Sequence, residues 1–573
     1  MKDLKISGSL SFLLCCSIYV NAQQAINGRE SVTTIIVDAT KSIGTIEPIW
    51  NSLGGNLGLA LTPQGDRLLQ KIAESSPYPY YRRCWGLTNS GTPRSSGGGI
   101  NYGAANIYHV DENGRPYYDF TLFDHLIDGV VSKGFIPIML LGSMPDSLSS
   151  APLATAEGRD NIQKYPPRDY IEWYNLVNQI VKHCIERYSK ENVTAWKWEL
   201  WNEPDLKEYW MGTEEEYFKL YDYTASAIKD ALPETMIGGN TVTQSLRRGT
   251  PFLTKFVEHC LHGKNFKTGK TGTPLDFISF HLKGTSFDIK RLGNFSAGKI
   301  PENIPRFSPS LDFILECAEN NLKAIASIPG TSGIPVYVTE CDIDIGLTVS
   351  TYENPSVEYR NTEYHPVFQC ALTKEIFDIS SRYPDNPIRT ITFDGLYYPG
   401  YRIFEGQRAL FTAEEIEKPV FNAFRLLGKL GTERLEFFSS GNDNIDGLAS
   451  RNGDKIQVMV YNFNQDVNDR NTHNVELSVT VPVSGPYKLT HYRIDENHSN
   501  AYSIWKSLGK PFVPDISQMK KIRSKQGLEL YEPVKVISPV SPGNPDNPDN
   551  PVIKVLLDMP HHSVSLLIFE PAK

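Results

Sequence analysis

The chain has 573 residues, of which 40% are hydrophobic and 21% are charged, and its formal net charge at pH 7 is −9. This composition excludes a disordered protein, and the length suits one large domain with one or two smaller ones. Because affinity for phosphate backbones needs clustered Lys and Arg, the acidic balance argues against a nucleic-acid partner.

The N-terminus predicts a cleaved signal peptide over residues 1–22. Two lysines precede an apolar run at residues 6–20, and Val-Asn-Ala then offers a cleavage site. The run is shorter than the roughly 18 to 20 residues that a spanning helix needs, so we expect an extracytoplasmic protein, periplasmic or secreted, without a membrane span. A lipid anchor through Cys15 or Cys16 is the alternative, which Leu14 disfavours because a small residue is expected there.

Residues 45–430 alternate short apolar runs with amphipathic segments. The runs predict parallel strands near 49–55 and at 80–84, 135–141, 195–200, 236–239, 276–281, 335–339 and 391–398. Apolar residues at helical spacing predict helices between them, for example at 170–188, 214–232 and 366–379. The alternation predicts a (β/α)8 TIM barrel, in the α/β class. A doubly wound open sheet is the alternative, and the lack of a glycine-rich fingerprint after the first strand disfavours it.

Residues 431–573 change to a period-two alternation of apolar and polar residues. The clearest segments are 455–462, 474–483, 487–492 and 563–570, and they predict an accessory antiparallel β-sandwich domain. The segment 23–44 precedes the barrel, and its residues 31–39 are a candidate strand of this β domain.

The strongest local signal is the run Ala-Trp-Lys-Trp-Glu-Leu-Trp-Asn-Glu-Pro-Asp at residues 195–205. The predicted fourth strand ends just before Asn202 and Glu203, on the barrel face where active sites are built. Glu203 is therefore a candidate proton donor, and Asn202 is a candidate hydrogen-bond partner of a substrate hydroxyl. A loop Glu followed by a turn-forming proline is the structural alternative.

A second buried run, Ile-Pro-Val-Tyr-Val-Thr-Glu, forms the predicted seventh strand and ends in Glu340. Glu203 and Glu340 are 340 − 203 = 137 residues apart, yet both would project from one barrel face. Two carboxylates flanking a glycosidic bond are the usual apparatus for its hydrolysis, and a separation of about 5 to 5.5 Å would retain the configuration. Glu340 would then have to stay ionised, and this chemistry needs no metal or organic cofactor.

With these two glutamates placed, the chain resembles glycoside hydrolase family 39, which includes β-xylosidases and α-L-iduronidases. The resemblance covers nearly the whole chain after residue 22, in short motifs at 201–205, 338–340, 134–137 with 144–145, 277–281, 492–495 and 498–505. It implies a retaining barrel enzyme with an accessory β-sandwich that acts on oligo- or polysaccharides. It also implies that Glu203 is the acid/base and Glu340 the nucleophile.

Several positions resemble the iduronidase branch of that family. The run from His281 to Gly284 resembles its His-x-Lys-Gly, and Asp394 and Arg408 lie 408 − 394 = 14 residues apart, a spacing similar to that branch. The resemblance implies that His281 and Asp394 line the substrate site and that Lys283 and Arg408 bind a uronate carboxylate. An Arg fork and a Lys point charge both suit an anion. The alternative is that the two cations are rim or structural charges paired with nearby carboxylates.

One departure from the family concerns Trp85. The family's Arg-x-His-Gly run is Arg-Cys-Trp-Gly at residues 83–86, so Trp85 takes the place of the histidine. The ring could stack on a sugar or fill the core below the loop.

The sequence favours an exo-acting glycosidase that releases a terminal uronic acid. A β-D-xylosidase with the same machinery is the alternative. A non-catalytic carbohydrate-binding protein is a remote one, because such a protein would be expected to lose a catalytic carboxylate.

Overall fold

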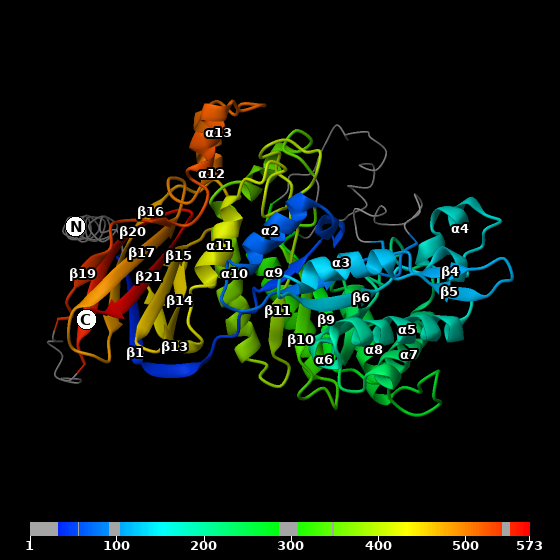
Figure 1. The fold of residues 1–573 in the computed structure, drawn as a ribbon. Coiled ribbons are helices and arrows are strands. Elements are labelled where there is room, and N and C mark those ends of the chain that lie inside the picture. The colour runs from blue at the N-terminus through cyan, green and yellow to red at the C-terminus, as the bar shows by residue number, and fades with distance from the viewer. Residues whose placement is uncertain are drawn as a thin grey trace, which may run out of the picture.

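The structure is a computed structural model, and it describes residues 32–55, 57–90, 104–285, 308–346, 349–540 and 550–572. The predicted signal peptide, with Cys15 and Cys16, lies outside the described residues. Figure 1 shows a barrel surrounded by helices and, beside it, a β domain built mainly from the C-terminal part of the chain.

Parallel strands form the barrel predicted from the sequence. In chain order they are β2 (Ser52–Gly54), β3 (Tyr81–Cys84), β6 (Ile136–Leu141), β7 (Lys197–Leu200), β8 (Met236–Val242), β9 (Phe277–Lys283), β10 (Val336–Asp342), β11 (Ile388–Ile391) and β12 (Phe393–Asp394). β11 pairs with β10 and β12 pairs with β2, so these two short strands share the eighth position and nearly close the sheet. The (β/α)8 fold class is therefore confirmed.

The eighth strand differs from its predicted position at residues 391–398. It occupies residues 388–394 and ends before Gly395, which has a φ of 145°. A Cβ atom at Gly395 would lie 2.0 Å from the Arg408 carbonyl, so the chain turns there into a loop that folds back on itself.

Helices cover the outside of the barrel. They are α2 (Pro63–Ala73), α3 (Thr121–Val131), α5 (Tyr170–Tyr188), α6 (Lys190–Ala195), α7 (Glu214–Ala231), α8 (Gly249–His262), α9 (Leu311–Ala326), α10 (Tyr364–Ser381) and α11 (Pro419–Leu427), with the short α4 (Ala156–Asp160) in a loop. α7 begins with a capping box between Thr213 and Glu216, which fixes its first residue. No helix among the described residues is long and apolar enough to cross a membrane.

The β domain is one curled sheet of ten strands. Its strands are β1 (Thr33–Thr45), β13 (Glu433–Ser440), β14 (Ile445–Asn452), β15 (Lys455–Asn462), β16 (Thr472–Thr480), β17 (Tyr487–Ile494), β18 (Glu529–Leu530), β19 (Lys535–Ile537), β20 (Val552–Pro560) and β21 (Ser563–Pro571). The pairs are antiparallel except for β1 with β16. The sheet curls around one core, to which strands towards both of its ends contribute, for example Leu489 in β17 and Ile553 in β20. β1 comes from the segment before the barrel, as the sequence suggested, while the exact domain limits remain predictions.

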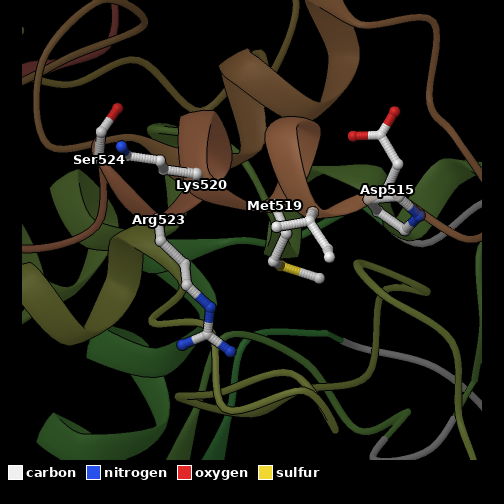
Figure 2. A pocket seen from close by; sticks show the side chains of 7 residues that line it. Asp515, Met519, Lys520, Arg523 and Ser524 are labelled. Atoms are coloured by element: carbon white, nitrogen blue, oxygen red, sulfur yellow. The ribbon is translucent and has the colours of Figure 1, made fainter.

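A helical projection interrupts the β domain, and the period-two pattern did not predict it. α12 (Ala501–Ser507) and α13 (Ile516–Arg523) lie between β17 and β18 and are too short to give a strong helical period. α13 projects from the molecule (Figure 1), and beneath it lies an open hollow of about 660 Å³, shown in Figure 2. All its lining residues belong to the stretch 514–524, so this hollow is separate from the predicted site residues.

Candidate active site

The predicted site residues come from neighbouring barrel strands at the same end of the barrel. Glu203 lies in the turn after β7. His281 and Lys283 lie at the end of β9, and Glu340 lies near the end of β10. Because β7, β8, β9 and β10 are consecutive and parallel, their carboxyl ends meet at one face. The sequence had placed Glu340 at the very end of its strand, whereas β10 continues for two further residues to Asp342.

The two glutamates approach each other across His281. One carboxylate oxygen of Glu203, one of Glu340 and one ring nitrogen of His281 all lie within 4.8 Å of one another. The Nδ1 atom of His281 is 2.9 Å from Glu203 Oε1 and 3.9 Å from Glu340 Oε2. His281 is fully buried, so its ring is held in place by packing. This approach of the two carboxylates is nearer to the roughly 5 to 5.5 Å between the carboxyl groups of a retaining site than to the roughly 6.5 to 9.5 Å of an inverting site.

Arg83 is a central site residue that the sequence did not identify. From β3 its guanidinium donates to Glu340 Oε1 at 2.7 Å, to Glu199 Oε2 at 2.8 Å and to Asn202 Oδ1 at 3.0 Å. A buried Arg in a four-residue barrel strand was the available signal, because such a charge must find a partner inside the protein. Glu199, a fully buried acid in β7, was the corresponding sign of a buried partner of opposite charge.

Lys283 binds the other oxygen of Glu340. Its Nζ donates to Glu340 Oε2 at 2.6 Å and also contacts Asp342 Oδ2. Asp342 was not predicted either, although it lies two residues after Glu340 and so projects to the same side of β10. Both oxygens of Glu340 are thus paired with buried cations.

These cations set the charge state of Glu340. Burial alone would raise the pKa of its carboxyl group, but His281, Lys283 and Arg83 outweigh burial and hold the pKa well below its usual range. In return, Asp342 and Glu340 raise the pKa of Lys283 despite its burial. Glu340 is therefore ionised at neutral pH, and Lys283 is protonated.

Arg408 and Asp394 complete the other side of the cluster. Arg408 Nη2 lies 3.0 Å from Asp342 Oδ2 and 3.4 Å from Asp394 Oδ2, and Nη1 donates to the Asp344 carbonyl. The backbone N–H of Asp394 donates to Asp342 Oδ1 at 2.9 Å. The structure therefore brings Lys283, Asp394 and Arg408 together around Asp342, next to Glu340.

The pKa of Asp394 is shifted in the opposite direction to that of Glu340. Its burial, followed by the charges of Glu340 and Asp342, raises the pKa of its carboxyl group to about 6, although Lys283 and Arg408 act in the other direction. One face of the barrel thus holds a firmly ionised carboxylate and a carboxyl group that titrates near neutral pH, an arrangement found in acid–base sites.

The remaining predicted residues, Asn202 and Trp85, lie beside these groups in the chain. Asn202 is buried, and because its Oδ1 accepts from Arg83, its amide nitrogen is the group left for a substrate. Trp85 directly follows β3, two residues after Arg83, and is half-buried.

Two sets of side chains in the described residues have the spacing of metal ligands. They are Glu203, His281 and Glu340, and Glu340, Asp342 and Asp394. In both sets Glu340 is already neutralised by Arg83 and Lys283, and Arg408 neutralises Asp342. These carboxylates are thus already paired with side-chain cations, which favours chemistry performed by the carboxylates themselves.

Comparison with known proteins agrees with this geometry. The sequence model of "Glycosyl hydrolases family 39" matches residues 33–536. A β-xylosidase of Caldicellulosiruptor saccharolyticus is 28% identical over 504 residues, which cover 86% of this chain and 91% of that protein. Human α-L-iduronidase is 23% identical over 572 residues, covering 92% of this chain and 78% of that protein.

A solved structure supports the fold. That of a bacterial orthologue of human α-L-iduronidase has a TM-score of 0.74 at 18% identity and covers 95% of this chain and 84% of its own. Since the family match extends over most of the chain and the barrel carries two facing glutamates, the protein belongs to glycoside hydrolase family 39 and is a glycoside hydrolase.

Proposed function

We propose that the enzyme is a retaining exo-glycosidase in which Glu340 is the nucleophile and Glu203 the acid/base, and that its preferred substrate carries a terminal uronic acid. The single observation that carries the mechanism is the approach of one oxygen of each carboxylate to within 4.8 Å of the other and of a His281 ring nitrogen. That spacing suits direct attack by one carboxylate on the sugar.

In the first step, an oxygen of Glu340 attacks the anomeric carbon while Glu203 gives its proton to the glycosidic oxygen, and the alcohol leaves. In the second step, Glu203 takes a proton from water, whose oxygen attacks the same carbon and breaks the bond to Glu340. The low pKa of Glu340 supports both steps, since an ionised carboxylate is needed for attack and a stable one departs easily. Arg83 and Lys283 stabilise this charge before and after the covalent intermediate.

The uronide preference rests on Lys283 and Arg408. Two of the three ammonium hydrogens of Lys283 are directed at Glu340 and Asp342, which leaves one for a substrate. Both cations are buried beside the proposed nucleophile, where an attraction to a substrate carboxylate is stronger than at an exposed site. The sugar carboxylate would lie on the side of Asp342 and Asp394, and a protonated Asp394 would accept it without repulsion.

A β-D-xylosidase is the second candidate, favoured by the 28% identical β-xylosidase. The cations would then serve only to hold Asp342, Asp394 and Glu340 in place.

The decisive experiment compares turnover of an aryl α-L-iduronide with that of an aryl β-D-xyloside. We expect hydrolysis of the iduronide with retained configuration, and a KM for it that rises about 10-fold or more in Lys283→Ala, because one charge-assisted hydrogen bond is lost. Since Lys283 also contacts the proposed nucleophile, a fall in kcat without a rise in KM would not support the uronide hypothesis. Activity on the xyloside alone, with a KM for the xyloside that does not change in Lys283→Ala, would rule out the uronide preference.

Glu340→Gln tests the mechanism independently of the sugar. We expect it to abolish turnover of either substrate, while hydrolysis that survives intact would refute the assignment of the nucleophile.

We also propose that the enzyme acts outside the cytoplasm, on the basis of the predicted signal peptide at residues 1–22. N-terminal sequencing of the exported protein should begin at Gln23, and export with an intact N-terminus would argue against the cleavage.

A further inference from the structure

The turn that carries Glu203 has an unfavourable backbone conformation. Trp201 and Glu203 have φ angles of 64° and 45°, in the left-handed region that residues other than glycine rarely adopt. Such residues persist only where the surrounding structure holds them. The contacts that hold this turn therefore decide where the Glu203 carboxylate points.

Thr241, near the end of β8, makes these contacts. Its hydroxyl donates to the Trp201 carbonyl at 3.0 Å. The backbone N–H of Glu203 donates both to the Thr241 hydroxyl at 3.2 Å and to the Thr241 carbonyl at 3.1 Å. One fully buried side chain thus bridges the two left-handed residues, where water cannot replace it.

β8 is distorted at this point in a way that explains the contact. Its pairing with β9 shifts in register between Gly239 and Val242, and inside the shift Asn240 and Thr241 have φ angles of 124° and 43°. Such irregularities redirect side chains and are common beside active sites. Here the distortion leaves Thr241 free to bond to the turn after β7.

A second contact fixes the far end of the same turn. The N–H and hydroxyl of Thr243 donate to the two carboxylate oxygens of Asp205 at 3.0 and 2.6 Å, and Leu206 N–H donates to the Glu203 carbonyl at 3.0 Å. Neither Thr243 nor Asp205 contacts the Glu203 N–H. The conformation of Glu203 itself therefore depends on Thr241.

We propose that Thr241 is a positioning residue that directs the Glu203 carboxylate toward the glycosidic oxygen of the substrate. This inference rests on the proposed acid/base role of Glu203. Without the Thr241 hydroxyl the Trp201 carbonyl loses its donor and the Glu203 N–H keeps only the Thr241 carbonyl, so the turn relaxes and the 2.9 Å approach of Glu203 to His281 lengthens. Glu340 is held separately by Arg83 and Lys283, so the nucleophile stays in place. Proton donation alone then suffers, because it depends on distance and alignment.

The test uses Thr241→Val, which keeps the shape of the side chain and removes its hydroxyl, and Thr241→Ser, which restores the hydroxyl. Each variant is assayed by kcat/KM on two aryl glycosides of the sugar that the enzyme accepts. A dinitrophenyl group departs with little protonation, whereas a phenyl group needs an acid. We expect Thr241→Val to lose roughly 10-fold or more on the phenyl glycoside relative to the dinitrophenyl glycoside, and Thr241→Ser to recover most of the loss.

Two further variants make the result unambiguous. Thr373→Val removes an equally buried hydroxyl in α10, which donates only to the Gln369 carbonyl of its own helix, and should affect neither substrate. Glu203→Gln should show the same leaving-group dependence more strongly. If Thr241→Val lost equally on both substrates while Glu203→Gln showed the leaving-group dependence, the positioning role of Thr241 would be overturned and the role of Glu203 would stand. Absence of the dependence in Glu203→Gln would overturn the acid/base assignment and, with it, this inference.

Discussion

Charges of opposite sign alternate from one side chain to the next through the candidate active site. Arg83 lies between Glu199 and Glu340, and Lys283 lies between Glu340 and Asp342. Breaking a buried pair of this kind leaves an uncompensated charge, at a cost of about 3 to 5 kcal/mol. Each of these side chains therefore contributes to stability, and Arg83 and Lys283 also keep Glu340 ionised.

Asp394 gives this network a pH dependence of its own. Its pKa is about 6 in the folded protein against an ordinary value of 3.8, so the folded state binds its proton more tightly than the unfolded state does. The stability associated with that proton is present below about pH 4 and is lost as the pH rises to about 6.

Asp394→Asn removes this titration, because an amide resembles the protonated carboxyl group. Urea unfolding at pH 4, 5, 6 and 7 should show the variant gaining stability relative to the wild type across this window. Glu340 should not interfere: its contribution falls as the pH drops through the ordinary carboxyl value of 4.5, but both proteins carry this residue, so the effect cancels in the difference between them. A constant difference between the two proteins across the window would mean that Asp394 does not titrate there.

Among the elements, the loop after β12 depends on the helical projection of the β domain. This loop carries Arg408, and its Phe404 packs against Tyr502 and Trp505 of α12 with ring centroids 5.3 and 5.5 Å apart. Ile522 of α13 joins the same small core. The β domain thus supports the loop on one side of the candidate active site through aromatic packing.

Trp505→Ala should therefore destabilise the protein by about 3 kcal/mol, as expected for removal of a large buried ring. Leu556→Ala is the control, because Leu556 in β20 is 80% exposed and its replacement should change stability by less than about 0.5 kcal/mol. Thermal unfolding monitored by circular dichroism compares the two. Equal melting temperatures would show that α12 does not contribute to the folded core.

At the scale of the whole molecule, the first strand, β1, connects the β domain to the barrel. β1 pairs with β13 on one side and, in parallel, with β16 on the other, and the chain then continues directly into the barrel. Because a strand alternates its side chains between faces, Ile35 and Val37 are fully buried in the core of the β domain while Ile36 between them is 48% exposed.

Val37→Asp should consequently prevent stable folding of the β domain, since it places a charge in an apolar core without a partner. Ile36→Asp introduces the same charge one residue away on the outer face and should be tolerated. Soluble yield and melting temperature distinguish the two variants. Similar values for both would contradict the register of β1 between β13 and β16.

The sequence by itself determined the repetitive features of the protein. Apolar runs and helical spacing predicted α5 at its observed limits and most barrel strands to within three residues, because a parallel strand covered on both faces must be apolar throughout. The same pattern located Glu203 and Glu340 at strand ends, and with them the family. It failed for β12, whose end is set by Gly395, and for α12 and α13, which are too short for a period.

Only the tertiary structure decided which charges meet. Arg83 and Glu340 are 257 residues apart, and Lys283 and Glu340 are 57 apart, so no local pattern could pair them. Whether a buried Arg or Lys is a partner of a carboxylate or an open site for a substrate depends on which strands lie side by side in the closed barrel. The pKa of Glu340, the titration of Asp394 and the contact of Thr241 with Glu203 all follow from that arrangement, since electrostatic and hydrogen-bond energies depend on distance in space and not along the chain.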